Sequence, residues 1–438
     1  MSDLKLESIQ PWTPHPKAAP LTERSGESLA VAANGTCTCL GGWQLIFSGV
    51  TPGMTYDICW EAEHQEIDCV RDALQCTAYW GDLPPEDFGR WRQRWDFLLP
   101  ETTGAQTLRF SRRMTAPEGV DHLMLRCTFR WYTKGESVWR LPRIEPVPSL
   151  EPSGPVTVAV VTGRADARQR SFQSIQDNLD FYVPLCEAAC QEGPDLVVLP
   201  EVALQYGMSG RALDLAVPAP GPETEVFAEV ARRHRVYILL GMYEQDGDAV
   251  HNSAILIDPD GTIQGRYRKV HLAMAGEIDT GMLPGDTFPV FETGIGRIGC
   301  NICMDSSAAE SSRMVGLNGA DFLLIPIMGD FRACYPEKRG VDPDRFRAIM
   351  RVRAMDNQFC VVVACNHAQG SCIIDHVGDV LAWNDGDQDF IQARVKVDHR
   401  YRAPSGGSHR GVTWMQRRPH LYRAFDAEEN VGALLRDA

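Results

Sequence analysis

The sequence has no apolar run long enough to form a membrane-spanning helix, and residues 1–8 lack the apolar core of an export signal. It also has no excess of positive charge, because 58 aspartates and glutamates outnumber 43 lysines and arginines and give a formal net charge of −15. Such an acidic chain is poorly suited to binding nucleic acid or an anionic membrane. We therefore expect a cytoplasmic protein with no nucleic-acid or membrane partner.

The 14 cysteines lack the paired spacing and the histidine partners of a structural zinc site. A disulfide framework is not expected either, since the cysteine fraction is modest and nothing directs the chain to an oxidising compartment. These absences predict reduced thiols, no metal and no cofactor. The chain also lacks internal repeats and low-complexity tracts, so its 438 residues favour two ordinary globular domains.

The first part of the chain is predicted to be rich in β-structure. Residues 1–30 are polar, contain four prolines and are expected to form an extended N-terminal arm. Residues 31–148 contain short β-like runs separated by turns, such as 123–129, where side chains alternate as in a half-buried strand. We predict an antiparallel β-sandwich here. Its tryptophans are expected mainly in the core or at an interface, while exposed ones could stack on a sugar.

A proline-rich linker, residues 149–155, precedes a region with a different pattern. From 156 to 398, apolar runs typical of buried strands alternate with segments of helical periodicity, for example 156–161 and then 169–191. Alternation of this kind predicts a layered α/β domain. The C-terminal tail, residues 399–438, is rich in arginine and is a possible contact in an oligomer.

Cys303 is the first candidate for chemistry. Residues 298–303 are predicted to be a buried strand and 308–317 a helix, with a polar turn between them. A thiol at that junction lies near the positive end of the helix dipole, which favours the thiolate and suits a nucleophile. The alternative is an inert core cysteine, which is what we expect of Cys300 on the opposite face of the strand.

Two charged residues occur at the ends of other apolar runs. Glu201 ends the run 195–201, and Lys269 ends the strand within 265–272. A carboxylate can take the thiol proton as Cys303 attacks an electrophilic carbon, and an ammonium can stabilise the developing oxyanion. Taken singly, Glu201 could cap a following helix and Lys269 could be a solvated charge. Their recurrence at strand ends favours one shared site.

Taken together, these segments resemble the motifs of the nitrilase superfamily of carbon–nitrogen hydrolases. Residues 195–201, 267–272 and 299–305 are similar to the segments that carry the glutamate, the lysine and the cysteine of that family. The resemblance covers about 156–397 and implies an α-β-β-α sandwich. The β-rich region 31–148 resembles, in the order of its segments, the jelly-roll modules of carbohydrate-binding and galactose-binding-like domains.

The resemblance also implies roles for individual residues. It assigns the general base to Glu201, the transition-state stabiliser to Lys269 and the nucleophile to Cys303. Many members of the family have a second glutamate between the lysine and cysteine motifs, which helps to hold the lysine or the substrate. Glu277 is the candidate by position, Glu292 is the alternative, and a plain surface charge is the simplest reading of either.

Substrate contacts are expected near the cysteine and in one loop. Asp305 follows the cysteine closely, and the loop 328–342 follows a predicted strand end. From this loop we predict that Met328, Arg332 and Tyr335 bind substrate. An arginine and a tyrosine would suit an anionic or polyhydroxylated substrate, whereas the alternative is a solvated loop.

The leading functional hypothesis is a cofactor-independent amidohydrolase that cleaves a non-peptide C–N bond through a thioester on Cys303. Within the same chemistry, a nitrilase and an N-acyltransferase remain open. A protein of another class would be a catalytically silent one that binds a glycan or a partner through its β-sandwich. The resemblance implies a small-molecule amide or nitrile substrate and a homodimer or higher homo-oligomer.

Overall fold

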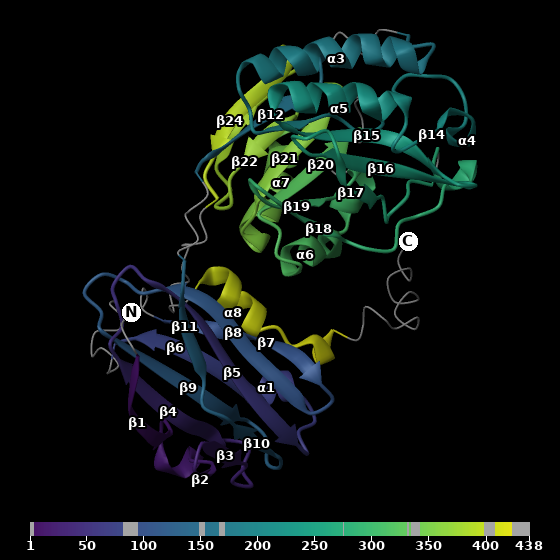
Figure 1. The fold of residues 1–438 in the computed structure, drawn as a ribbon. Helices are drawn as coiled ribbons and strands as arrows, with labels where there is room; N and C mark the ends of the chain where they lie inside the picture. Colours follow the sequence, from purple (N-terminus) through teal and green to yellow (C-terminus); the bar gives the residue numbers. More distant parts are fainter. Residues whose placement is uncertain are drawn as a thin grey trace. The chain divides into compact units, whose positions relative to one another are not determined.

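A computed structural model describes residues 4–81, 95–148, 154–165, 171–274, 276–330, 333, 342–397 and 408–422. The chain divides into two compact units (Figure 1). Unit 1 consists of Met1–Glu151 together with Arg400–Ala438, and unit 2 consists of Pro152–His399. Among the described residues, no helix is both long enough and apolar enough to cross a membrane.

Unit 1 is built from antiparallel strands. They are β1 Lys5–Trp12, β2 Leu21–Ser25, β3 Ser28–Ala32, β4 Leu40–Ser48, β5 Thr55–Gln65, β6 Leu74–Trp80, β7 Trp95–Gly104, β8 Thr107–Thr115, β9 His122–Arg130, β10 Glu136–Trp139 and β11 Arg143–Val147. Their hydrogen-bonded order is β1-β4-β9-β6-β7-β8-β5-β10-β3-β2, with β11 paired to β5. β7 changes partner along its length, because its first residues pair with β6 and its later ones with β8.

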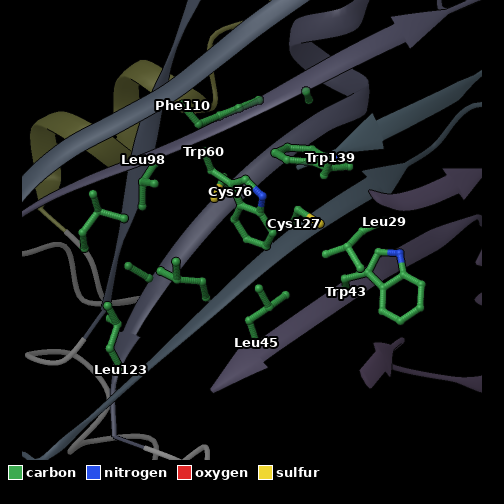
Figure 2. Packing of buried hydrophobic residues seen from close by; sticks show 14 of the residues in the cluster. Leu29, Trp43, Leu45, Trp60, Cys76, Leu98, Phe110, Leu123, Cys127 and Trp139 are labelled. Atoms are coloured by element: carbon green, nitrogen blue, oxygen red, sulfur yellow. The ribbon is translucent and has the colours of Figure 1, made fainter. Parts of the chain in front are cut away.

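The core of unit 1 is centred on tryptophans (Figure 2). The rings of Trp60 and Trp139 meet edge to face with centroids 5.3 Å apart, and Phe110 packs on Trp139 at 5.1 Å. Both tryptophans are fully buried, and their indole N–H groups donate to the Arg140 carbonyl and the Ser137 hydroxyl. A buried indole needs such an acceptor. These tryptophans are therefore core residues rather than a surface for stacking on a sugar.

The prediction of an extended arm at 1–30 is wrong. β1 pairs with β4, while β2 and β3 form a hairpin that pairs with β10. Pro11 is tolerated in β1 because this strand lies at the end of the strand order, where a missing backbone N–H need not break the ladder. Leu29 and Val31, at alternate positions of β3, are fully buried in the core. Prolines alone therefore did not exclude strands here.

β9 is buried more fully than its alternation predicts. All residues from 123 to 129 are buried, including Arg126 on the face opposite to the apolar core. The Arg126 Nε donates to Gln44 Oε1 at 2.7 Å, and the guanidinium lies over the rings of Trp12 and Tyr79. The prediction of a half-buried strand is thus wrong, because aromatic side chains cover its polar face.

The described part of the C-terminal tail, residues 408–422, belongs to unit 1. Helix α8, His409–Met415, packs on β7. The Ser408 N–H and hydroxyl donate to the buried Asp96 carboxylate at 3.1 and 3.3 Å, and Arg112 donates to the same group at 2.9 Å. The tail thus completes the β-rich unit, and a contact with a second copy of the chain stays a prediction.

A second anchor for this segment brings together a cysteine, an aspartate and a histidine. The ligand atoms of Cys69, Asp72 and His420 lie within 4.8 Å of one another, a spacing that a metal ion could bridge. The Arg418 guanidinium, however, donates to the Asp72 carboxylate from two nitrogens at 3.0 and 2.9 Å. Since a cation already occupies this carboxylate, we assign the group to attaching the C-terminal segment.

The described residues of unit 2 form two sheets and four principal helices. The first sheet has the order β17-β16-β15-β13-β12-β24, with β14 beside β15, and the second runs from β18 to β23 in sequence order. The first sheet comprises β12 Val156–Val161, β13 Leu196–Val198, β14 Val217–Pro218, β15 Tyr237–Asp246, β16 Ala249–Ile257, β17 Ile263–Arg268 and β24 Phe390–Val395. The second comprises β18 Val290–Thr293, β19 Gly296–Cys300, β20 Phe322–Ile327, β21 Cys360–Cys365, β22 Cys372–Ile374 and β23 Val380–Trp383. The helices are α3 Ile175–Gln191, α5 Pro222–His234, α6 Ala309–Leu317 and α7 Pro343–Asn357.

Three apolar clusters define the layers of unit 2 (Figure 1). One lies between the first sheet and helices α3 and α5, one between the two sheets, and one between the second sheet and helices α6 and α7. The central strands are buried on both faces, which explains their continuous apolar runs. The predicted fold class, an α-β-β-α sandwich preceded by a separate antiparallel β-domain, is confirmed.

Replacing Asp96 with Ala should destabilise unit 1, because the Arg112 guanidinium and the Ser408 N–H lose this buried acceptor. We expect the free energy of unfolding to fall by about 1–3 kcal/mol. Tryptophan fluorescence in urea reports mainly on unit 1, since Trp383 is the only tryptophan within 152–399. The control, Glu101→Ala, removes a carboxylate that is 66% exposed and should change stability by less than about 0.5 kcal/mol. Equal stability of the two variants would contradict this anchor.

Candidate active site

Three strand ends of unit 2 converge on one point. Glu201 lies three residues beyond β13, Lys269 directly follows β17, and Cys303 lies three residues beyond β19. The Lys269 Nζ is 2.9 Å from Glu201 Oε1, and the two side chains are only 1% and 3% exposed. The Cys303 thiol lies close enough to interact electrostatically with both charges, and its sulfur donates to the Gly329 carbonyl at 3.7 Å. The structure therefore brings the three strand-end residues together.

Glu277 joins this charged cluster from the loop before the 3-10 turn η3, Ile278–Thr280. Its Oε1 is 2.8 Å from Lys269 Nζ, and its Oε2 accepts a backbone N–H at 2.6 Å. Glu292, the alternative, lies on β18 with 75% of its side chain exposed and pairs with an arginine. Of the two glutamates, Glu277 is the one beside the lysine.

Sequence reasoning missed Asn252, which lies in the middle of β16. Its Nδ2 donates to Glu201 Oε1 at 2.8 Å and to Glu277 Oε1 at 2.6 Å. The other Glu201 oxygen, Oε2, accepts the Met328 N–H at 2.9 Å, and the Glu201 carbonyl accepts from Asn366 Nδ2 at 2.6 Å. The available signal was a run of three polar residues, His251 to Ser253, inside a buried strand, which by itself points to no particular site.

The backbone at Cys303 is strained. Its φ of 44° lies in the left-handed region, which a residue other than glycine rarely adopts. Such a conformation costs of the order of 1–3 kcal/mol and persists where the surroundings enforce it. Cys303 begins the 3-10 turn η4, Cys303–Ser307, and the α-helix starts only at Ala309. The prediction that the thiol lies directly beside the α-helix N-terminus is therefore wrong.

The electrostatics also differ from that prediction. Burial raises the pKa of the Cys303 thiol, the Glu201 carboxylate raises it further, and Lys269 opposes them only in part. Burial would lower the pKa of Lys269, but the charges of Glu201, Cys303 and Glu277 outweigh it and raise that pKa above its ordinary value. At neutral pH the site therefore holds a protonated thiol beside an ammonium. Attack by the sulfur requires a base that takes the thiol proton.

Asp305 clamps the cysteine turn to the lysine strand. Its side chain is fully buried and accepts from the Ile302 N–H at 2.9 Å and the Tyr267 hydroxyl at 2.6 Å. It also accepts from the backbone N–H and the Nδ1 of His271, at 2.8 and 2.9 Å. The prediction that Asp305 binds substrate is wrong, because these donors enclose both carboxylate oxygens. The residue instead supports the strained backbone of Cys303.

The predicted substrate loop is described only at its start. Arg332 and Tyr335 lie outside the described residues. The Met328 side chain is 46% exposed, one residue before the Gly329 carbonyl that lies 3.7 Å from the Cys303 sulfur. Met328 therefore lies close to the thiol, and its contact with a substrate stays a prediction.

Most of unit 2 matches a known protein family in sequence. Residues 157–404, more than half of the chain, match the family model for carbon-nitrogen hydrolases. The chain belongs to the carbon–nitrogen hydrolase family. It is thus an enzyme that acts on carbon–nitrogen bonds other than peptide bonds, and the predicted membership of the nitrilase superfamily is confirmed.

The chain is similar to amidases and to a nitrilase. Omega-amidase NIT2 of Xenopus tropicalis is 28% identical over 243 residues, which span 51% of this chain and 84% of that protein. Omega-amidase NIT2 of Danio rerio is 30% identical over 277 residues, or 58% of this chain and 93% of that protein. A nitrilase of Pyrococcus abyssi (strain GE5 / Orsay) is 36% identical over 185 residues, or 41% and 65%. These relatives support an amidase or nitrilase-like activity.

Solved structures agree on the fold. A carbon-nitrogen hydrolase from Helicobacter pylori G27 matches with a TM-score of 0.50 and 20% identity, over 62% of this chain and 98% of that one. The C. elegans NitFhit protein matches with a TM-score of 0.50 and 23% identity, over 62% of this chain and 66% of that one. At these identities the likeness concerns the architecture alone.

The His271–Asp305 pair should make stability depend on pH. Its hydrogen bond to Asp305 raises the pKa of His271 above its ordinary value of 6.5. The pair therefore stabilises the fold fully below that ordinary value, and its contribution is lost as pH rises through the folded value. His271→Gln should lower the free energy of unfolding more at about pH 5.5 than at about pH 9. Because the His271 side chain is 43% exposed, the difference should be at most about 1 kcal/mol. A loss that is equal at both pH values in urea denaturation would contradict this role.

Proposed function

We propose that the protein is an amidase that hydrolyses a small-molecule amide through a thioester on Cys303, without a cofactor. One observation carries the proposal. The Lys269 ammonium is buried between the Glu201 and Glu277 carboxylates, and the cluster lies against a cysteine held in a strained turn. A buried charged group of this kind, with a nucleophile at its edge, is arranged for proton transfer coupled to nucleophilic attack.

In the first half of the proposed reaction, the Cys303 sulfur attacks the amide carbon while Glu201 takes the thiol proton. The carbonyl π electrons move to oxygen, and the Lys269 ammonium stabilises the resulting oxyanion. When the oxyanion collapses, the carbon–nitrogen bond breaks and Glu201 returns its proton to the leaving nitrogen. Ammonia or an amine leaves, and the acyl group remains on sulfur as a thioester.

In the second half, Glu201 takes a proton from water, and the hydroxide formed attacks the thioester carbon. The oxyanion again lies beside Lys269, and its collapse breaks the carbon–sulfur bond. The sulfur regains a proton from Glu201, and the carboxylic acid product leaves. The cycle consumes only water and an amide. It uses the raised pKa of the Cys303 thiol directly, because a protonated nucleophile needs a base in contact with it.

The choice of amide over nitrile rests on the relatives, since the first matches are omega-amidases and a nitrilase also occurs among them. The same sulfur chemistry could hydrate a nitrile carbon or pass the acyl group to an amine. Product analysis separates the cases. An amidase releases carboxylate and ammonia from an amide, a nitrilase releases them from a nitrile, and an acyltransferase forms a new amide.

We further propose that the protein forms a homodimer or a larger homo-oligomer. We also propose that Met328, Arg332 and Tyr335 contact the substrate.

Replacing Cys303 with Ala should abolish hydrolysis, because it removes the sulfur that attacks the amide in the proposed mechanism. We expect a loss of at least about 10³-fold in ammonia release from a panel of primary amides. Cys300→Ala is the matched control, since Cys300 is a fully buried cysteine three residues away. It should keep most of the activity. Equal activities of the two variants would exclude the thioester mechanism.

Replacing Glu277 with Gln should lower kcat more than it raises KM, because Glu277 holds Lys269 rather than the substrate in this proposal. The expected decrease in kcat is about 10²-fold, comparable with loss of one oxyanion-stabilising donor. Glu292→Gln is the control, since that side chain is 75% exposed and away from the lysine. A Glu277→Gln enzyme with normal kcat would remove Glu277 from the catalytic group.

A further inference from the structure

We propose that Asn252 is a positioning residue of this site, whose side-chain amide bridges the Glu201 and Glu277 carboxylates and holds both of them around a single Lys269 ammonium. The inference rests on the proposed function. It assigns a fourth buried polar group to the reaction, one that contacts neither the sulfur nor, in this account, the substrate.

The contacts form a closed arrangement of two donors and two acceptors. Glu201 Oε1 and Glu277 Oε1 each accept from Lys269 Nζ, at 2.9 and 2.8 Å. The same two oxygens each accept from Asn252 Nδ2, at 2.8 and 2.6 Å. Two carboxylates this close repel each other, and one ammonium supplies only half of the compensating charge. The two N–H groups of the amide stabilise the pair without adding a second positive charge to the site.

The orientation of the amide is fixed by its surroundings. Turning it over would place Oδ1 against two carboxylate oxygens, and all three would be acceptors. Asn252 is 1% exposed, and in the observed orientation its Oδ1 has no hydrogen-bond partner among the described residues. An unpaired buried acceptor is costly. The free-energy cost of the unpaired Oδ1 is offset here by the two hydrogen bonds that the amide N–H groups donate to the carboxylates.

Asn252 also positions the lysine through its main chain. The Asn252 carbonyl accepts the Lys269 N–H at 2.9 Å, just beyond the pairing of β16 with β17. One residue therefore fixes the backbone from which the ammonium extends and the carboxylates that receive it. A serine or an alanine at this position would keep the main-chain bond and remove the amide.

Among the described residues, the titratable groups that we find around the pair come from several elements. Lys269 follows β17, Cys303 belongs to η4, and Tyr243 on β15 lies opposite Asn252 in the β15–β16 register. Burial raises the pKa of Tyr243 to about 12, with Glu201 and Glu277 adding to the effect, so this phenol stays neutral. Within the described part of the chain, Lys269 is the cation that contacts both carboxylates, so loss of the amide should act directly on them.

The test is the pH dependence of Cys303 alkylation by iodoacetamide, measured on the Cys303 peptide by mass spectrometry. This measurement needs no knowledge of the substrate, because alkylation of the protonated thiol depends on the same base as the proposed reaction, Glu201. Asn252→Asp places a third carboxylate against the other two, so a proton should bind at higher pH. The acid limb of the rate profile should move up by at least about one pH unit. Asn252→Ser should move it in the same direction by less, and it serves if the aspartate variant does not fold.

Asn366→Ala is the matched control. Asn366 is also buried and donates to Glu201, but to its main-chain carbonyl rather than to its carboxylate. This variant should leave the acid limb in place even if it lowers thermal stability. An unmoved acid limb in both Asn252 variants, with Cys303 still labelled faster than the other cysteines in wild type, would overturn the inference alone. If wild-type Cys303 reacts no faster than the other cysteines, the proposed function fails instead.

Discussion

The site of unit 2 depends on one buried ammonium shared between two carboxylates. Lys269 is 1% exposed and lies 2.9 Å from Glu201 and 2.8 Å from Glu277. Removing a partner from a buried ion pair typically costs about 3–5 kcal/mol, because the remaining charge stays buried. Such a cluster is stable only where surrounding groups supply further donors, as the Asn252 side-chain amide and the Met328 backbone N–H do here. The two sheets hold these donors at fixed positions.

The nucleophile depends on that arrangement but comes from the other sheet. The lysine and the base follow strands of the first sheet, while Cys303 follows β19 of the second. Asp305 links the two, since it accepts from the turn that carries Cys303 and from His271, two residues after Lys269. The left-handed backbone of the cysteine is thereby held against the base. Packing of the two sheets thus positions the chemistry that we propose.

The sequence predicted this fold and the three strand-end residues because local signals were strong. Apolar runs ended at Glu201, Lys269 and Cys303, and the order of their motifs fixed the family. Contacts between residues far apart in the sequence left no such local signal. Asn252 is one of three consecutive polar residues in a buried strand, and its partners lie 51 and 25 positions away. The composition of 1–30 suggested an arm, because edge pairing with a distant strand leaves little periodicity in the sequence.

The pKa of the Cys303 thiol could not be predicted from the sequence either. A strand–helix junction suggested a thiolate, yet burial and the Glu201 charge raise the pKa of Cys303, and neither is visible in sequence. The most direct test of the account is the mass of an acyl adduct trapped on Cys303 by rapid acid quench during turnover of a primary amide. The account predicts that the mass of the Cys303 peptide increases by the mass of the amide minus that of ammonia. Turnover of the amide with no adduct at Cys303, or with one on another residue, would contradict it.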